Sequence, residues 1–225
     1  MTLNLLERSG ITISSQKDFS FFSVPGNQSY HSTNYIIEGD WSGAAFFLVA
    51  GAVKGRIKIK NLYPDSLQAD KNIVGVLESA GAEISTSHDT VEVKHKRLDA
   101  FNFDATECPD LFPPLTALAC CCKGRSVIAG VGRLKHKESN RAETLVSEFS
   151  KIGADISIDG DRMKINGKKI KGGMINSHND HRIAMAGAIA GLFSRQGVKI
   201  DNWQAVSKSY PGFYNDLRSI GGKVI

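Results

Sequence analysis

The distribution of apolar residues predicts three helices that are apolar on every face. They span residues 40–50, 113–120 and 183–193, where Ala and Gly are mixed with Leu, Phe, Ile and Val. A short helix without a polar face is typical of a protein core. We therefore expect these three helices to be buried, and their small residues to let them approach one another closely.

The three apolar helices recur at a regular interval. An aspartate stands near the start of each one, and Asp40, Asp110 and Asp180 are evenly spaced along the chain. Each helix is followed by a turn that contains Gly and by a short strand, predicted at 56–60, 126–129 and 198–200. A repeat of this kind outweighs any local prediction, because it indicates one structural unit used several times.

A second, amphipathic helix belongs to each unit and ends at Gly10, Gly81, Gly153 or Gly221. We expect each of these glycines to adopt the left-handed conformation that ends a helix, and to lead directly into a strand. After Gly153, alternating residues at 155–158 and 162–165 predict a hairpin with Asp159-Gly160 as its turn.

These patterns predict an α/β fold built inside out, with helices buried and sheets outside, from about three repeated βαβαββ units. The chain begins within an amphipathic helix and stops just after one. We therefore expect residues 1–38 to be the tail of a unit in another, N-terminal domain that precedes Met1, and residues 39–225 to form one domain.

Composition limits the classes of function. The content of 41% hydrophobic and 23% charged residues is that of an ordinary globular protein. A net charge of +5 suits an anionic small substrate or a nucleic acid. Basic residues are not interleaved with aromatics, and apolar runs are too short to span a bilayer, so we expect neither a nucleic-acid nor a membrane partner.

The cysteines do not have the spacing of a metal site. Cys120, Cys121 and Cys122 are adjacent and must point in different directions, and Cys108 stands apart from them. We expect reduced thiols in a cytoplasmic protein, with no metal and no cofactor.

Candidate chemistry is concentrated in residues 132–141, which hold four cations, one histidine and Glu138. Such a charge run is either a solvated helix face or an anion-binding strip with Glu138 as proton donor. Helix starts also bind anions through their free N–H groups. N-capping explains Asp40 and Asp180, whereas Asp110 precedes Pro113 and Pro114 and can project into a cleft.

Further basic residues lie nearer the C-terminus. His181 and Arg182 follow Asp180, and Lys208 precedes Tyr210-Pro211. Taken alone, His181 is equally well a capping or core histidine and Lys208 a surface lysine. His136 and His178 have no interpretation from the sequence.

Several of these segments resemble the motifs of the 3-phosphoshikimate 1-carboxyvinyltransferase (EPSP synthase) family. They are Glu38-Gly39-Asp40-Trp41-Ser42-Gly43-Ala44, Cys108-Pro109-Asp110, Lys137-Glu138-Ser139-Asn140-Arg141, Asn179-Asp180-His181-Arg182 and Lys208-Ser209-Tyr210-Pro211. The resemblance covers essentially the whole chain in order. It implies the two-domain fold of that family (EPT/RTPC-like), of which this chain would be the C-terminal half.

The resemblance also implies a reaction, in which shikimate 3-phosphate attacks phosphoenolpyruvate through its 5-hydroxyl and phosphate leaves. Asp110 matches the family's base, and Glu138 matches the residue that protonates the methylene carbon and later removes that proton. The other matches are substrate-binding residues: Arg141, Arg182 and Lys208 for phosphoenolpyruvate, Lys137 near the attacking hydroxyl, and His181 beside the acid.

Two departures from the family qualify this interpretation. The family usually has Asp where Asn140 stands, which removes a carboxylate next to Arg141. The family's N-terminal domain supplies most contacts to shikimate 3-phosphate, so we expect this fragment alone to be inactive.

Three other interpretations remain open at this point. One is the related enzyme that transfers the enolpyruvyl group to UDP-N-acetylglucosamine, and another is a non-catalytic basic module that binds polyanions. The third concerns residues 1–38, for which disorder, packing onto this domain and pairing with another chain all remain open. The strand-like stretch 19–24 would favour pairing and self-association.

Overall fold

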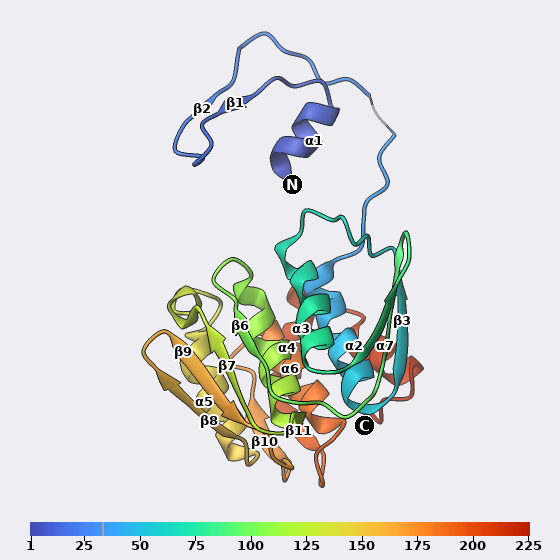
Figure 1. The fold of residues 1–225 in the computed structure, drawn as a ribbon, viewed down its shortest axis with the longest axis vertical. Helices are drawn as coiled ribbons and strands as arrows, with labels where there is room; N and C mark the ends of the chain where they lie inside the picture. Colours follow the sequence, from blue (N-terminus) through green and yellow to red (C-terminus); the bar gives the residue numbers. More distant parts are fainter. Residues whose placement is uncertain (33) are drawn as a thin grey trace. The chain divides into compact units, whose positions relative to one another are not determined.

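The computed structural model describes residues 1–32 and 34–225 and divides the chain into two compact units, Met1–Glu38 and Gly39–Ile225 (Figure 1). The first unit contains helix α1 (Thr2–Arg8) and a short antiparallel pair, β1 (Ser14–Ser15) with β2 (Phe22–Ser23). Of the strand expected over 19–24, only β2 is formed. Its neighbours Phe19, Phe21 and Val24 are exposed.

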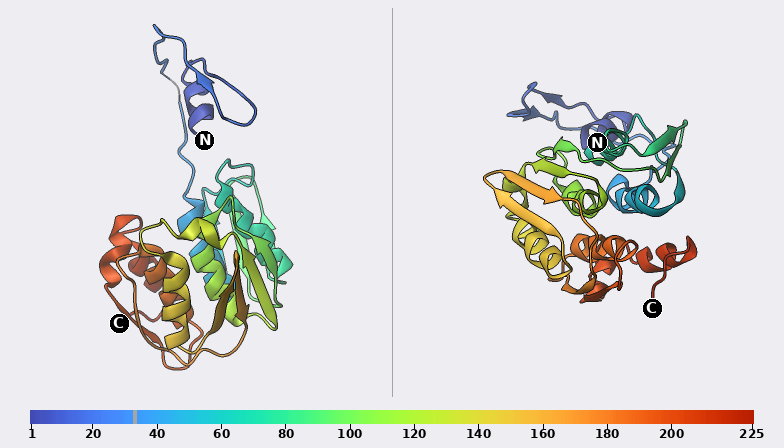
Figure 2. Two further views of the ribbon diagram at one scale, coloured as in Figure 1. Left: turned by 90° about the vertical axis from the view of Figure 1, so that its left-hand side faces the viewer. Right: turned by 60° about the horizontal axis from the view of Figure 1, so that its bottom comes forward.

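Three helices form the interior of the second unit: α2 (Trp41–Lys54), α4 (Phe112–Cys121) and α6 (His181–Gly191). Almost all of their residues are buried, as the apolar pattern predicts. Each of the three contacts the other two, and they lie side by side in the right-hand view of Figure 2. Arg182, at the start of α6, contacts Asp110, which precedes α4, so the starts of these two helices lie close together.

Three sheets accompany these helices. The first is antiparallel, in the order β3 (Arg56–Lys60), β5 (Thr90–Lys94), β4 (Glu83–Thr86). The second has the order β6 (Asn102–Asp104), β7 (Arg125–Ala129), β9 (Arg162–Asn166), β8 (Asp155–Asp159), and only its β6–β7 pair is parallel. The third is the parallel pair β10 (Gly173–Asn176) and β11 (Val198–Asp201). The fold is thus of the mixed α/β class.

The amphipathic helices are α3 (Ile73–Ser79), α5 (Arg141–Lys151) and α7 (Phe213–Ser219). The glycines expected to end α1, α3, α5 and α7 all have φ between 80 and 95°, in the left-handed region. The strands β4 and β8 follow Gly81 and Gly153 closely, as predicted. The prediction of a strand directly after the glycine is wrong for Gly10, since β1 begins at Ser14, and for Gly221, since residues 222–225 form no strand.

Two local predictions need correction. Asp159 pairs with Arg162, so the β8–β9 turn is made by Gly160 and Asp161, one residue later than expected. Asp110 does not start α4 but lies in a short 3₁₀ helix, η2 (Pro109–Leu111), that precedes it. The remaining 3₁₀ helices are η1 (Ala69–Asn72), η3 (Val131–Leu134) and η4 (Trp203–Lys208).

None of the helices within residues 1–32 and 34–225 combines the length and the apolar character needed to cross a membrane. The four cysteines are free thiols, and burial raises the pKa of each.

Candidate active site

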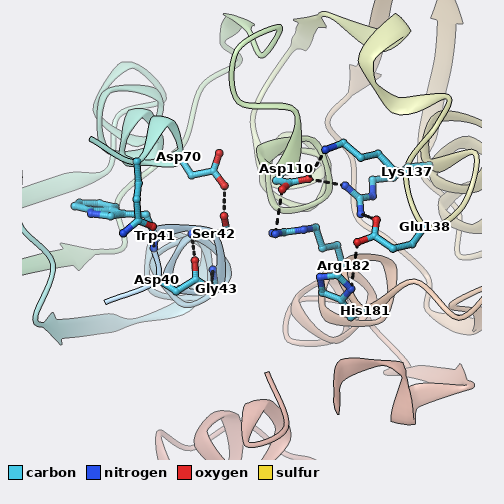
Figure 3. A network of polar contacts seen from close by, with 12 residues as sticks. Asp40, Trp41, Ser42, Gly43, Asp70, Asp110, Lys137, Glu138, His181 and Arg182 are labelled. Atoms are coloured by element: carbon cyan, nitrogen blue, oxygen red, sulfur yellow. Dashed lines mark hydrogen bonds and ion pairs between the residues drawn. The ribbon is translucent and has the colours of Figure 1, made fainter. Parts of the chain in front are cut away.

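Asp110 is the point at which three cations from different elements meet. Its Oδ1 atom lies 2.8 Å from Nη1 of Arg141 and 3.3 Å from Nζ of Lys137, and its Oδ2 atom lies 3.1 Å from Nη2 of Arg182 (Figure 3). The side chain remains 30% exposed. The position of Asp110 in η2, ahead of the buried α4, thus turns its carboxylate toward the starts of α5 and α6.

The charges around Asp110 decide its ionisation. Burial by itself would raise the pKa of Asp110, but Arg182, Arg141 and Lys137 outweigh burial and lower that pKa. The carboxylate is therefore ionised at neutral pH and is a weak base while the three cations surround it.

Arg141, the first residue of α5, is completely buried and is paired on every side. Its Nε donates to Asp180 Oδ2 at 2.9 Å, its Nη1 donates to Asp110, and its Nη2 donates to Glu138. Burial would lower the pKa of Arg141, but the bond to Asp180 and the three carboxylates raise it. One guanidinium thus holds three carboxylates together.

Glu138 and His181 lie next to each other at the edge of this network. Glu138 is 38% exposed, and its Oε1 atom is 3.8 Å from Nδ1 of His181. His181 is 5% exposed, and neither of its ring nitrogens has a hydrogen-bond partner. Burial, helped by Arg182, lowers the pKa of His181. The imidazole is therefore neutral at pH 7, and its contact with Glu138 is not an ion pair there.

Asp180 does more than the N-capping expected of it. It accepts from the backbone N–H of Arg182 at 2.9 Å, as a cap does. Its carboxylate is fully buried and also accepts from Arg141 and, at 3.1 Å, from Ser139 Oγ. Lys208, at the end of η4, reaches the same helix start from another side, and its Nζ donates to the carbonyl oxygen of Asn179 at 2.8 Å.

A second polar group lies at the start of α2. Asp40 caps this helix by accepting from the N–H groups of Ser42 and Gly43, at 2.9 and 3.0 Å. Ser42 donates its hydroxyl to Asp70, which is only 7% exposed. Burial raises the pKa of Asp70. Figure 3 shows Asp70 and Ser42 beside α2, across from Asp110 and Arg182.

The structure brings together most of the residues expected in the site. Asp110, Glu138, Lys137, Arg141, His181 and Arg182 form one connected network. Lys208 joins it only through the backbone of Asn179. Arg141, expected to bind substrate, is buried beneath the carboxylates, so a ligand can touch it only if Glu138 or Asp110 moves.

Sequence reasoning missed two features of this region. Asp70 gave no signal, because its partner Ser42 is far away in the chain. Glu148 and His178, which join α5 to the loop before α6, were also missed. The sequence contains a carboxylate and an imidazole at these positions, but no spacing that relates them. Among residues 1–32 and 34–225, no group of three or more His, Cys, Asp or Glu side chains is arranged to hold a metal ion.

Comparison with solved structures supports the fold. EPSP synthase from Acinetobacter baumannii matches with a TM-score of 0.87 at 25% sequence identity, over 99% of this chain and 54% of that one. A second structure of EPSP synthase from the same organism matches with a TM-score of 0.85.

Comparison of sequences identifies the family. The family model of EPSP synthase (3-phosphoshikimate 1-carboxyvinyltransferase) matches residues 1–217. The 3-phosphoshikimate 1-carboxyvinyltransferases of Clostridium novyi and Brachyspira hyodysenteriae are each 41% identical to the chain, over 99% and 100% of its length. The chain spans about half the length of these curated relatives, 51% and 54%. With a family model matched over nearly its whole length, the chain belongs to the EPSP synthase family.

Proposed function

We propose that this chain carries part of an active site that transfers the enolpyruvyl group of phosphoenolpyruvate to the 5-hydroxyl of shikimate 3-phosphate, with release of phosphate. The observation that carries the proposal is the pairing of two carboxylates, Asp110 and Glu138, through one buried guanidinium, Arg141. Two carboxylates fixed close together suit a reaction that needs one base and one acid.

The proposed chemistry has two steps. The 5-hydroxyl oxygen adds to C2 of phosphoenolpyruvate, Asp110 takes the hydroxyl proton, and Glu138 gives a proton to the methylene carbon C3. In the second step, Glu138 removes a proton from C3 as the C2–O bond to phosphate breaks, which restores the double bond. The proton held by Asp110 leaves with the phosphate.

The cations around Asp110 link the binding of substrate to the strength of Asp110 as a base. Without substrate, Asp110 neutralises Lys137 and Arg182. We propose that the phosphate and carboxylate of phosphoenolpyruvate take over Arg182 and Lys208, and that Lys137 turns to the attacking hydroxyl. Because Arg182 and Lys137 lower the pKa of Asp110, losing them to the substrates makes Asp110 a stronger base. His181, neutral beside Glu138, can exchange a proton with it.

The proposal includes the architecture expected from the sequence. We propose that α2, α4 and α6 with their neighbouring sheets are three copies of one unit, which forms an inside-out domain over residues 39–225. The even spacing of Asp40, Asp110 and Asp180 and the left-handed glycines after α3, α5 and α7 support this.

Residues 1–38 are proposed to complete another domain. Their exposed Phe19, Phe21, Phe22 and Val24 need a partner surface, and the relatives contain about as much chain again as this one. We propose that this other half covers them, and that its absence leaves the isolated chain inactive. The alternative is that two copies of the chain associate through these residues. Light scattering measures the mass in solution and so distinguishes a monomer from a dimer.

A cytoplasmic location is part of the same proposal. Its support is the four free cysteines, since thiols stay reduced in the cytoplasm.

The direct test joins this chain to the N-terminal half of the Clostridium novyi relative and measures phosphate release from phosphoenolpyruvate and shikimate 3-phosphate. We expect turnover by the joined protein, none by the 225-residue chain, and a loss of at least about 1,000-fold in Glu138→Gln with phosphoenolpyruvate still bound. The control is Glu143→Gln, which alters an exposed carboxylate on α5 and should stay within about twofold.

The other interpretations predict different results. Turnover with UDP-N-acetylglucosamine in place of shikimate 3-phosphate would favour the related transferase. Polyanion binding that falls steeply with salt and is unchanged by Glu138→Gln would favour a non-catalytic module. Turnover by the isolated chain near that of a complete enzyme would contradict the proposed need for another half.

A further inference from the structure

We propose that Glu148 and His178 are positioning residues for the candidate site, which they serve by holding the backbone before α6 in a left-handed conformation. The inference rests on the proposed function for its catalytic meaning, but its structural content can be tested alone. Neither residue touches Asp110 or Glu138, and neither was assigned a role from the sequence.

The segment before α6 has an unusual backbone. His178 and Asn179 have φ of 50 and 59°, two consecutive left-handed residues that are not glycine. Such residues persist in this conformation only when the surrounding structure holds them, and they are frequent at functional sites. The next residue is Asp180, whose carboxylate holds both Arg141 and the start of α6.

Glu148 provides the main anchor for this backbone. Its side chain, on α5, is only 1% exposed. It accepts from the N–H of Asn176 at 2.9 Å and is 2.8 Å from Nε2 of His178, so it binds both ends of a three-residue turn. Lys151 compensates its charge, with Nζ 2.7 and 2.8 Å from the two carboxylate oxygens.

Local hydrogen bonds also hold residues 176–179 in place. The side chain of Asn176 accepts from the N–H of His178 at 2.7 Å, and Ser177 Oγ accepts from the N–H of Asn179 at 3.2 Å. Ser177 in turn donates to the carbonyl of Asn202 at 2.9 Å. The turn is therefore fixed to α5 on one side and to the end of β11 on the other.

These bonds matter to the site because three of its cations, Lys208, Arg141 and Arg182, are hydrogen-bonded to Asn179 and Asp180 at the end of the turn. The carbonyl of Asn179 accepts from Lys208, and the carboxylate of Asp180 accepts from Arg141 and from the N–H of Arg182. If the turn relaxed to ordinary backbone angles, the Asn179 carbonyl and the Asp180 carboxylate would both move. Lys208, Arg141 and Arg182 would then no longer be held in fixed positions relative to one another.

The test uses the 225-residue chain and amide hydrogen exchange followed by NMR. Glu148→Gln removes the charge that holds His178, and Glu143→Gln on the same helix is the matched control. We expect exchange at the Arg182 amide to accelerate at least tenfold in Glu148→Gln, relative to the Leu118 amide in the core of α4. General loss of stability would accelerate both amides equally, so the ratio isolates the turn.

Binding of phosphoenolpyruvate is the second measurement, and it uses the same variants in the chain joined to the N-terminal half of the Clostridium novyi relative. We expect Kd to rise at least tenfold in Glu148→Gln and less than twofold in Glu143→Gln. If the joined protein binds no phosphoenolpyruvate while the amide ratio of the 225-residue chain changes as expected, the positioning role stands and the proposed function is contradicted.

A ratio within twofold of wild type in Glu148→Gln would overturn the inference, whatever the ligand does. Should Glu148→Gln fail to fold, His178→Asn decides by the same threshold. Asn tolerates the left-handed backbone but is too short to reach Glu148, so an unchanged ratio in that variant would equally overturn the inference.

Discussion

An aspartate caps both α2 and α6, but the two aspartates differ in burial and in their other contacts. Asp40 and Asp180 both accept from N–H groups of the helix that follows. Asp40 is exposed and its bonds are local, whereas Asp180 is fully buried and also binds Arg141 from α5. Capping therefore explains Asp40 completely but Asp180 only in part. Asp180 therefore combines the local capping role of Asp40 with a bond to a residue of another helix.

The largest difference in stability is expected when Asp40 and Asp180 are replaced, one at a time, by asparagine. Asparagine is as good an N-cap as aspartate, so Asp40→Asn should change the free energy of unfolding by less than about 0.5 kcal/mol. Asp180→Asn leaves the buried Arg141 with less compensation and should cost about 2–4 kcal/mol. Denaturant unfolding measures both, and equal effects would mean that Asp180 is only a cap.

The pH dependence of stability tests whether the charge of Glu148 stabilises the turn before α6. Burial would raise the pKa of Glu148, but bonds from Lys151, Asn176 and His178 lower it to about 2. A carboxyl with a lowered pKa stabilises the fold fully above its unfolded pKa of about 4.3, and loses that contribution as the pH falls toward 2.

Wild type should accordingly exceed Glu148→Gln in stability by about 2 kcal/mol at pH 7, with the difference shrinking between pH 4 and 2. Thermal unfolding over this range measures the difference. A gap that stays constant with pH would show that the charge of Glu148 is not what stabilises the turn.

A smaller loss of stability than that of Glu148→Gln is expected when the hydroxyl bond at the start of α2 is removed. Ser42→Ala removes a hydrogen bond that lowers the pKa of Asp70, so that pKa should rise further, and stability should fall by about 1 kcal/mol. A carbon-detected NMR titration of the Asp70 carboxyl measures the pKa. Ser207→Ala, at an exposed serine of η4, is the control. A fall in the pKa of Asp70 would contradict this expectation.

The elements predicted well from the sequence were those that local chemistry determines. Apolar runs identified α2, α4 and α6, and glycines such as Gly81 and Gly153 marked helix ends because only glycine adopts φ near 90° without strain. Register and turn position depend on cross-strand pairing, and for this reason the Asp159–Arg162 pair moved the hairpin turn by one residue.

The site was predictable as a set of residues but not as a geometry. The charge run 132–141 and the resemblance pointed to Glu138 and Lys137, which the structure joins to Asp110. The burial of Arg141 was not foreseeable, since a cation in a charge run is expected to face solvent or a ligand. Glu148 and His178 meet across 30 positions, and no pattern along the chain reports such a contact.

The proposed role of Glu138 is to move the proton at C3 of phosphoenolpyruvate. The most direct measurement is a reaction in D₂O by the chain joined to the N-terminal half of its relative, with mass spectrometry of the methylene group of the product. We expect deuterium in that methylene for the active protein and none in Glu138→Gln over the same time. Deuterium incorporated by Glu138→Gln at the rate of the unaltered protein would contradict it.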